Sequence, residues 1–195
     1  MADQIGVYHF ADNAQLFDVQ RNNAFEFVVT GLDNLLRAGA VGNESNAYIA
    51  NAQDVLRLSV VGAPIPHFTQ EEVEIKRGNS TLYYAGVPTF SEGTLTFNDF
   101  VGADTKSALM AWQNLSYNVK NQTVGSVADP ATNYKKDCYL IEYTPDFKPV
   151  RTWRLYGCWI KGLQEGDYSY EDGGKHQITA TVRYDRAEID LSSNN

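Results

Sequence analysis

The segment from Val55 to Tyr117 constrains the fold most, because it places strand patterns, a hairpin pattern and one helix pattern in close order. Apolar residues alternate at its start, which predicts a strand over 55–61 with Leu56, Leu58 and Val60 on one face. The following sequence Gly-Ala-Pro-Ile-Pro ends that strand, since proline cannot donate to a strand ladder. One helix cannot cover all the sheet edges of a chain with many strands, so the remaining edges must be protected in another way.

A long hairpin is predicted next. Residues 71–76 alternate, with Val73 and Ile75 on one side and three charged side chains on the other: Glu72, Glu74 and Lys76. The tetrapeptide 77–80, Arg-Gly-Asn-Ser, supplies turn residues before the strand that contains Tyr83 and Tyr84. An isolated two-stranded ribbon is marginal in water, so we expect this hairpin to pack on a neighbouring subunit.

Residues 93–98 alternate as a further strand, and a helix pattern follows. Asp104 is placed as its N-cap, and the apolar residues of the helix are Ala108, Leu109, Trp112, Leu115 and Val119. We expect the helix to end before the polar run that starts at Lys120.

Further strands are predicted over 22–32, 138–144, 151–160 and 177–190. The side chains expected to share a core face are Phe25, Phe27 and Val29; Trp153, Leu155 and Trp159; and Ile178, Ala180, Val182 and Tyr184. Residues 1–21 lack a clear period and are interpreted as an N-terminal arm. Residues 33–53, rich in Gly, Asn and Ser, are interpreted as a long loop or insertion.

These patterns predict one mainly β (α+β) domain spanning residues 1–195. Two antiparallel sheets are expected to form a sandwich or partly closed barrel, with one flanking helix and a protruding long hairpin.

The composition narrows the function. The net charge of −8 argues against nucleic-acid binding, because Lys and Arg supply the affinity for phosphates. The same acidity could repel a polyanion from a channel wall, or simply keep the chain in solution. The start of the sequence lacks the pattern of a secretory signal, so we expect the chain to stay in the cytoplasm where it is made. Cys138 and Cys158 are then expected to be free core thiols.

No catalytic constellation stands out, so no catalytic, cofactor-binding or metal residue is assigned and no enzymatic activity is expected. The acidic pairs Glu71-Glu72 and Glu171-Asp172 are interpreted as solvated surface. The three histidines have no spacing that suggests a metal site. Aromatic residues make up 12% of the chain, which fits sheet packing or interface anchors as well as ligand stacking.

The order of these motifs resembles the tube proteins of bacteriophage contractile tails, which are similar to the tube protein of type VI secretion. The resemblance is carried by Ala63-Pro64-Ile65-Pro66 after a strand, the charged hairpin 72–79, the strand 93–99 and Ala111-Trp112-Gln113 in the helix. Residues 134–137, Tyr-Lys-Lys-Asp, and 157–163, Gly-Cys-Trp-Ile-Lys-Gly-Leu, match as well, and the matched region runs from about Asn22 to Asp190.

The resemblance implies a structural virion protein. Six subunits would form a ring, and rings would stack into the hollow inner tail tube that conducts DNA and the tape measure protein. The implied partners are further copies of the chain, the tail sheath protein, the baseplate hub, the tape measure protein and the tail terminator. The implied location is the virion tail, with assembly in the host cytoplasm.

Two sets of site residues follow from this resemblance. Contacts between subunits or stacked rings are placed at the hairpin tip and the adjacent tyrosines: Arg77, Gly78, Asn79, Ser80, Tyr83 and Tyr84. Candidates for the lumen wall are Glu72, Glu74 and Lys76, since polar and core positions alternate along barrel strands. Three alternatives stay open: a tube protein of a type VI or phage-derived injection apparatus, a glycan-binding β-sandwich module and, as the weakest, a hydrolase that uses the acidic pairs.

Overall fold

The computed structural model describes residues 19–32, 52–100, 105–128, 133–170 and 173–190. The N-cap predicted at Asp104, most of the N-terminal arm and most of the 33–53 loop lie outside these residues.

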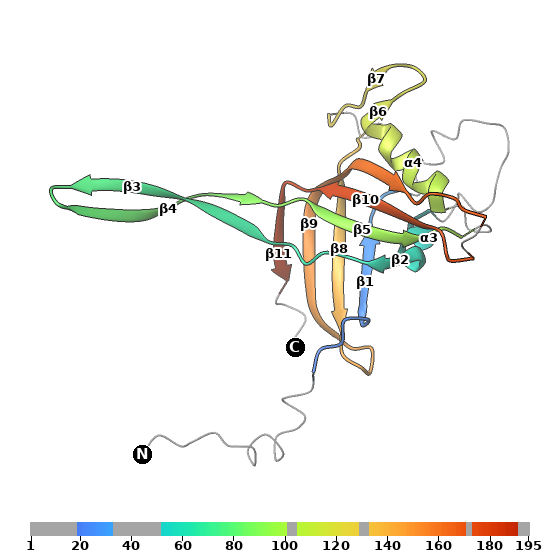
Figure 1. Ribbon diagram of the computed structural model, residues 1–195, viewed down its shortest axis with the longest axis horizontal. Coiled ribbons are helices and arrows are strands. Elements are labelled where there is room, and N and C mark those ends of the chain that lie inside the picture. The colour runs from blue at the N-terminus through green and yellow to red at the C-terminus, as the bar shows by residue number, and fades with distance from the viewer. Residues whose placement is uncertain (1–18, 33–51, 101–104, 129–132, 171–172, 191–195) are drawn as a thin grey trace, which may run out of the picture.

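Strands dominate the described chain, as predicted (Figure 1). The strands are β1 (Phe25–Val29), β2 (Val60–Gly62), β3 (Phe68–Arg77), β4 (Ser80–Phe90), β5 (Gly93–Asn98), β6 (Tyr117–Asn118), β7 (Thr123–Val124), β8 (Lys136–Tyr143), β9 (Pro149–Glu165), β10 (Gln177–Arg183) and β11 (Arg186–Asp190). The helices are α3 (Ala52–Ser59) and α4 (Thr105–Ser116).

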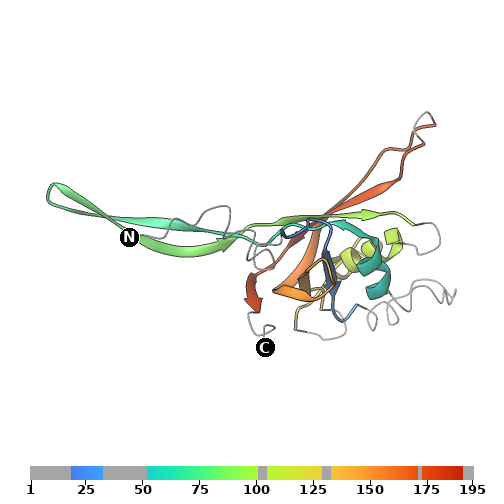
Figure 2. The ribbon, with the colours of Figure 1, turned by 90° about the horizontal axis from the view of Figure 1, so that it is seen from below.

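Seven strands form one curled antiparallel sheet in the order β1-β8-β9-β10-β5-β2, with β11 also paired to β9. The 17-residue strand β9 joins the two halves of this sheet. Its first part pairs with β8 and β11, and its last part pairs with β10. Figure 2 shows α3 and α4 together in the mouth of the curl, while the β3–β4 hairpin projects away from the body. The partly closed barrel and the protruding hairpin are thus confirmed.

The core lies between the two halves of the sheet and the helices. Phe27 and Val29 of β1 are buried, as are the four predicted residues of the last strand region: Ile178, Ala180, Val182 and Tyr184. Trp112 of α4 is also buried, and its indole Nε1 donates a hydrogen bond to the Tyr134 carbonyl at 3.2 Å. These core positions are confirmed.

The strand predicted over 55–61 is wrong for residues 55–59, because residues 52–59 form helix α3, and only Val60 and Val61 lie in a strand, β2. Helical spacing places Ala52, Leu56 and Ser59 on the buried face and leaves Leu58 79% exposed. The Ser59 hydroxyl bonds the Val55 carbonyl at 2.6 Å and the Thr105 hydroxyl at 2.9 Å, which joins the two helices. The described chain therefore has a second helix that the sequence reading did not predict.

The core face predicted for Trp153, Leu155 and Trp159 is wrong for Trp159, whereas Leu155 is buried in the core and Trp153 packs against it as predicted. Gly157 has a φ of 66°, and the β8–β9 register shifts between the pair Cys138–Leu155 and the pair Lys136–Cys158. The extra residue puts Leu155, Cys158 and Ile160 in the core. Trp159 then lies on the opposite face and packs edge-on against Tyr134.

Two predicted boundaries also differ. Helix α4 ends at Ser116, so Val119 lies beyond it and is 72% exposed. The strand predicted over 177–190 is divided into β10 and β11. Asp185 lies between them, and its amide donates a hydrogen bond to the Tyr156 carbonyl at 2.9 Å, so both strands run alongside β9.

We predict that Gly157→Ala destabilises the fold by about 1–3 kcal/mol, because an L-residue is strained at this φ. A Cβ there would also lie 2.4 Å from the Asp185 Oδ2. The matched control is Gly162→Ala, because no atom lies within 4 Å of a Cβ at that position of the same strand. Urea unfolding followed by circular dichroism measures both. Equal losses for the two variants would contradict the role of the bulge.

We predict that Trp112→Ala costs about 3–5 kcal/mol of the free energy of unfolding, because it empties a large core position. Met110→Ala on the same helix should change stability by less than about 0.5 kcal/mol, since Met110 is 45% exposed. The same unfolding experiment measures both. A small loss for Trp112→Ala would show that α4 does not close the core.

Candidate functional site on the projecting hairpin

The β3–β4 hairpin is anchored at its base and free along its length. Phe68 and Phe90 face each other across the ribbon with ring centroids 5.5 Å apart, and Phe90 packs edge-on against Tyr184 of the core at 6.1 Å. Beyond the base, the register shifts between Gln70 and Glu72. A Cβ on Gly86 would lie 2.6 Å from the Glu71 carbonyl oxygen, so glycine permits the close approach at this irregularity.

A two-residue loop closes the tip. Arg77 pairs with Ser80, which leaves Gly78 and Asn79 as the connection. Gly78 has a φ of 59°, a conformation that favours glycine at the first position of such loops. The predicted tip residues therefore do form the tip.

The register gives the ribbon one apolar side. Val73 lies opposite Tyr84, and Ile75 lies opposite Leu82. Side chains of directly opposed residues point to the same side of a sheet, so these four form one surface, which we call the apolar side. Each of the four is between 44% and 54% exposed, so nothing in the described chain covers them.

The other side carries the charges. Glu74 lies opposite Tyr83 and Glu72 opposite Ala85, and Lys76 continues the same row. The Lys76 Nζ is 3.6 Å from the Glu74 Oε1, and both side chains are exposed. An exposed ion pair of this kind contributes little to stability. The structure therefore brings Glu72, Glu74 and Lys76 together on a surface in contact with water.

The two tyrosines assigned as a pair are separated. Tyr84 belongs to the apolar side, and Tyr83 belongs to the charged side. Leu82 was not assigned to the site. Its place follows from the turn, because a two-residue loop at Gly78-Asn79 fixes the pairing of Ile75 with Leu82.

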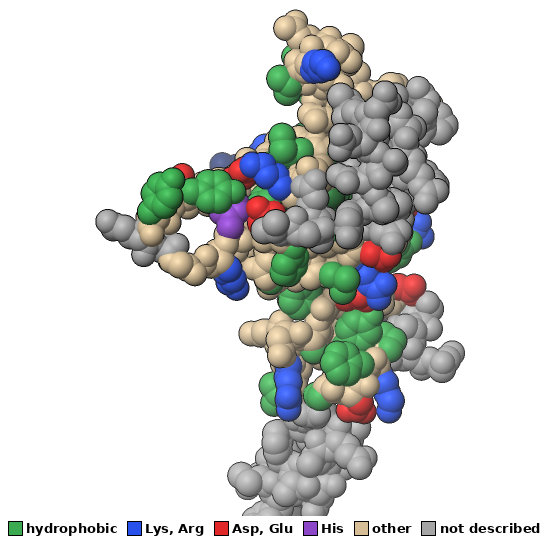
Figure 3. Space-filling view, turned by 90° about the vertical axis from the view of Figure 1, so that its right-hand side faces the viewer, with side chains coloured by type: hydrophobic (Ala, Val, Ile, Leu, Met, Phe, Trp, Pro, Cys, Tyr) green, Lys and Arg blue, Asp and Glu red, His purple; other side chains and the backbone are tan. Residues whose placement is uncertain are grey.

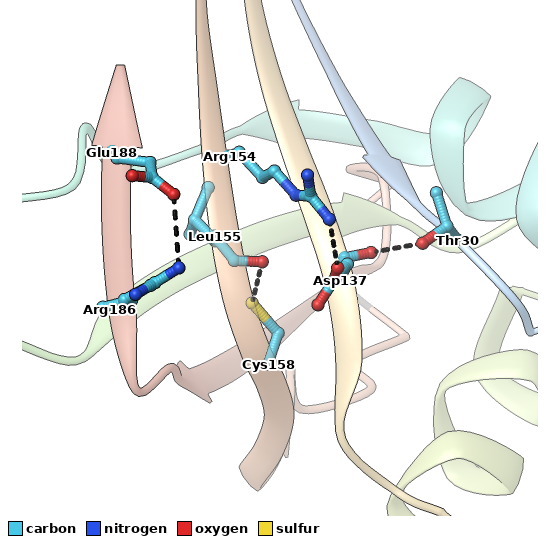
Figure 4. Close-up of polar contacts among 7 residues, drawn as sticks. All are labelled: Thr30, Asp137, Arg154, Leu155, Cys158, Arg186 and Glu188. Carbon is cyan, nitrogen blue, oxygen red and sulfur yellow. Dashed lines mark hydrogen bonds and ion pairs between the residues drawn. The ribbon is translucent and has the colours of Figure 1, made fainter. Parts of the chain in front are cut away.

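The body of the molecule carries a second ordered surface, on the outer face of β8, β9 and β11 (Figure 4). The Arg154 guanidinium lies 4.5 Å from the Tyr156 ring centroid, and the Arg186 guanidinium lies 4.3 Å from it. Arg154 pairs with Asp137 at 3.0 Å, and this hydrogen bond raises the pKa of Arg154. Arg186 lies 3.5 Å from Glu188. We call this set of residues the charged face.

No single sign of charge dominates the view in Figure 3, where acidic and basic side chains are interspersed. In the described residues no group of three His, Cys, Asp or Glu side chains could hold a metal ion. Cys138 and Cys158 are free and buried, and burial raises the pKa of the Cys138 thiol, which disfavours its reactive form. A membrane-spanning helix is also absent from the described part of the chain.

Comparison with known proteins relates this architecture to contractile machines. No family model and no curated protein sequence matches the chain. A chain of the PVC extracellular contractile injection system, from its sheath–tube complex in the extended state, matches with a TM-score of 0.61 and 14% identity over 96% of this chain and 99% of that one.

Two further solved structures match with a TM-score of 0.60 each. The PVC sheath/tube terminator is 15% identical over 89% of this chain and 98% of its own. The cap that terminates the tube of the anti-feeding prophage is 14% identical over 89% of this chain and 91% of its own. Because this similarity extends over most of each chain, the protein has the fold of these sheath–tube and tube-terminating chains of the PVC injection system and the anti-feeding prophage.

Proposed function

We propose that this protein is a structural subunit of the inner tube of a contractile bacteriophage tail. The observation that carries the proposal is the apolar side of the hairpin, uncovered in the described chain, on a fold similar to that of tube and terminator proteins. On this proposal the chain carries out no reaction, and its function is assembly.

The hairpin supplies a contact of useful size. Full burial of a Val, Ile, Leu or similar side chain is worth about 1.5–3 kcal/mol, so covering the remaining half of each contributes about 1 kcal/mol. The four residues of the apolar side would together contribute about 4 kcal/mol per neighbouring subunit. The charged side, with Glu72, Glu74 and Lys76, then stays in contact with water.

We propose that six subunits close a ring and that rings stack head to tail. A heterologous contact that does not close generates a filament, and stacked rings give a hollow one. The hairpin tip, Arg77 to Ser80, is proposed as part of the stacking contact. The bore would conduct DNA and the tape measure protein, with sheath, baseplate hub and terminator proteins as partners in the virion tail.

A second function is favoured by a specific observation. The solved structures reported above come from an extracellular contractile injection system and an anti-feeding prophage. The same subunit could therefore build the tube of an injection apparatus, or of the related type VI system, whose cargo is protein. Mass spectrometry and nuclease treatment of tubes purified from the native source would distinguish the two cargoes.

We predict that the purified chain forms hollow tubes or six-fold rings as its concentration rises. Negative-stain electron microscopy over a concentration series, with and without a preformed baseplate to start polymerisation, measures this. Compact monomers under both conditions would contradict the proposal and would call for a screen of glycan binding.

We predict that the double variant Ile75→Ser with Leu82→Ser folds normally but fails to form tubes, because both substitutions remove apolar area from the proposed contact. Circular dichroism and thermal unfolding report the fold, and electron microscopy reports assembly. The matched control changes the opposed pair on the charged side, Glu74→Ser with Tyr83→Ser, and should retain assembly. Normal tubes from the first variant would remove the apolar side from the mechanism.

A further inference from the structure

The half of the curled sheet that contains β5, β10 and the end of β9 has an outer face without charged residues over most of its area. Buried and partly exposed residues alternate along β5 and β10, so the residues between the buried ones point outward. The outward residues of three successive rows are threonines and amides, namely Thr94, Thr96, Asn98, Gln164, Gln177, Thr179 and Thr181, and the next outward residue of β10 is Arg183. We call these seven residues the hydroxyl–amide face.

The strand register places the seven residues in rows. Thr179 lies between Thr96 and Gln164, and Thr181 lies opposite Thr94. Gln177 lies opposite Asn98, and its Nε2 donates a hydrogen bond to the Asn98 Oδ1 at 3.1 Å. The face is therefore continuous across three strands.

Charged residues lie beside this face rather than within it. At one end of the rows lie Arg183, the outward residue of β10 after Thr181, and the ion pair of Lys161 with Glu92 at 2.6 Å. Lys106 and Glu165 pair at 2.6 Å on the core side, where Lys106 comes from α4. Figure 2 shows the helices on that core side, with no described helix or strand over the outer face of β5 and β10.

The charged face on β8, β9 and β11 differs from the hydroxyl–amide face in its chemistry. It holds two guanidinium groups with their carboxylate partners (Figure 4), and both guanidinium groups also contact the ring of Tyr156. Such groups form specific ion pairs and stacking contacts with a partner surface. A polymer moving along them would be held by each pair in turn.

We propose that the hydroxyl–amide face lines the bore of the tube, an inference that rests on the proposed function. Threonine suits such a wall because its branched side chain favours strands, and its rotating hydroxyl exchanges hydrogen bonds readily with water. A wall without charge forms no ion pairs with phosphates or with charged side chains, so a charged linear polymer passes without being held. Repetition of the face around each ring gives a band of uncharged residues, with Arg183, Lys161 and Glu92 at one end of it.

The location of the hydroxyl–amide face in the bore is tested by labelling a cysteine introduced on that face. Thr179→Cys introduces a partly exposed thiol, whereas the native Cys138 and Cys158 are buried. After assembly and reaction with maleimide-linked gold clusters, we expect gold along the tube axis by electron microscopy. Lys148→Cys is the control at the exposed β8–β9 turn, and its gold should lie off the axis. Thr94→Cys on the same face replaces the first variant if Thr179→Cys does not assemble.

The outcomes separate the two proposals. Gold off the axis for Thr179→Cys, or tubes that stay unlabelled although the monomer reacts, would overturn the assignment of the bore and leave the tube itself established. Failure of the unmodified protein to form tubes would overturn the proposed function and the inference with it.

The chemistry of the wall is tested by adding charge. Tubes of Thr179→Lys should retain a fluorescent DNA oligonucleotide at least about tenfold more than unmodified tubes at low salt, and the difference should vanish as salt rises. Thr179→Ser keeps the hydroxyl and should behave as the unmodified protein. Equal retention by unmodified and Thr179→Lys tubes would overturn the uncharged wall.

Discussion

The bulge at Gly157 is the constraint on which the arrangement of surfaces depends. Strand β9 pairs with β8 and β11 before the bulge and with β10 after it, so both halves of the sheet share this one strand. The extra residue also exchanges the two sides of the strand, so that Leu155 and Cys158 both enter the core three positions apart. The charged face and the hydroxyl–amide face therefore belong to two halves of one sheet that curl around one core.

A partly closed barrel leaves edges that a single chain cannot pair. In the described sheet, β1 and β2 are the terminal strands, and the outer side of β11 has no described neighbour. Exposed edges invite association, and full closure of a barrel removes them. A ring of subunits would pair such edges between copies, which agrees with a hairpin that leaves the body and exposes an apolar side.

Much of the fold could be predicted from the sequence, because alternation and turn residues report local structure well. The hairpin, β5 and the buried side of β10 were found from period two and from Gly78-Asn79. Helix α3 was missed because Leu56, Leu58 and Val60 imitate a strand, while the packing of Ala52, Leu56 and Ser59 selects the helix. The position of Trp159 was missed because the Gly157 bulge depends on a contact with Asp185 and on pairing with β8, which no local pattern contains.

The energy of the hairpin contact explains why assembly would be cooperative. A free energy of about 4 kcal/mol corresponds to a dissociation constant of about 1 mM, even before the loss of translational and rotational freedom is counted. One such contact cannot hold two subunits together. In a closed ring, each further contact forms within an assembly already held in place, so its effective concentration is high. The first ring is then the costly step. A substitution that removes about 2 kcal/mol from each contact is too small to affect the fold of a subunit. Over the six contacts of a ring the loss becomes about 12 kcal/mol, and this prevents the first ring from forming.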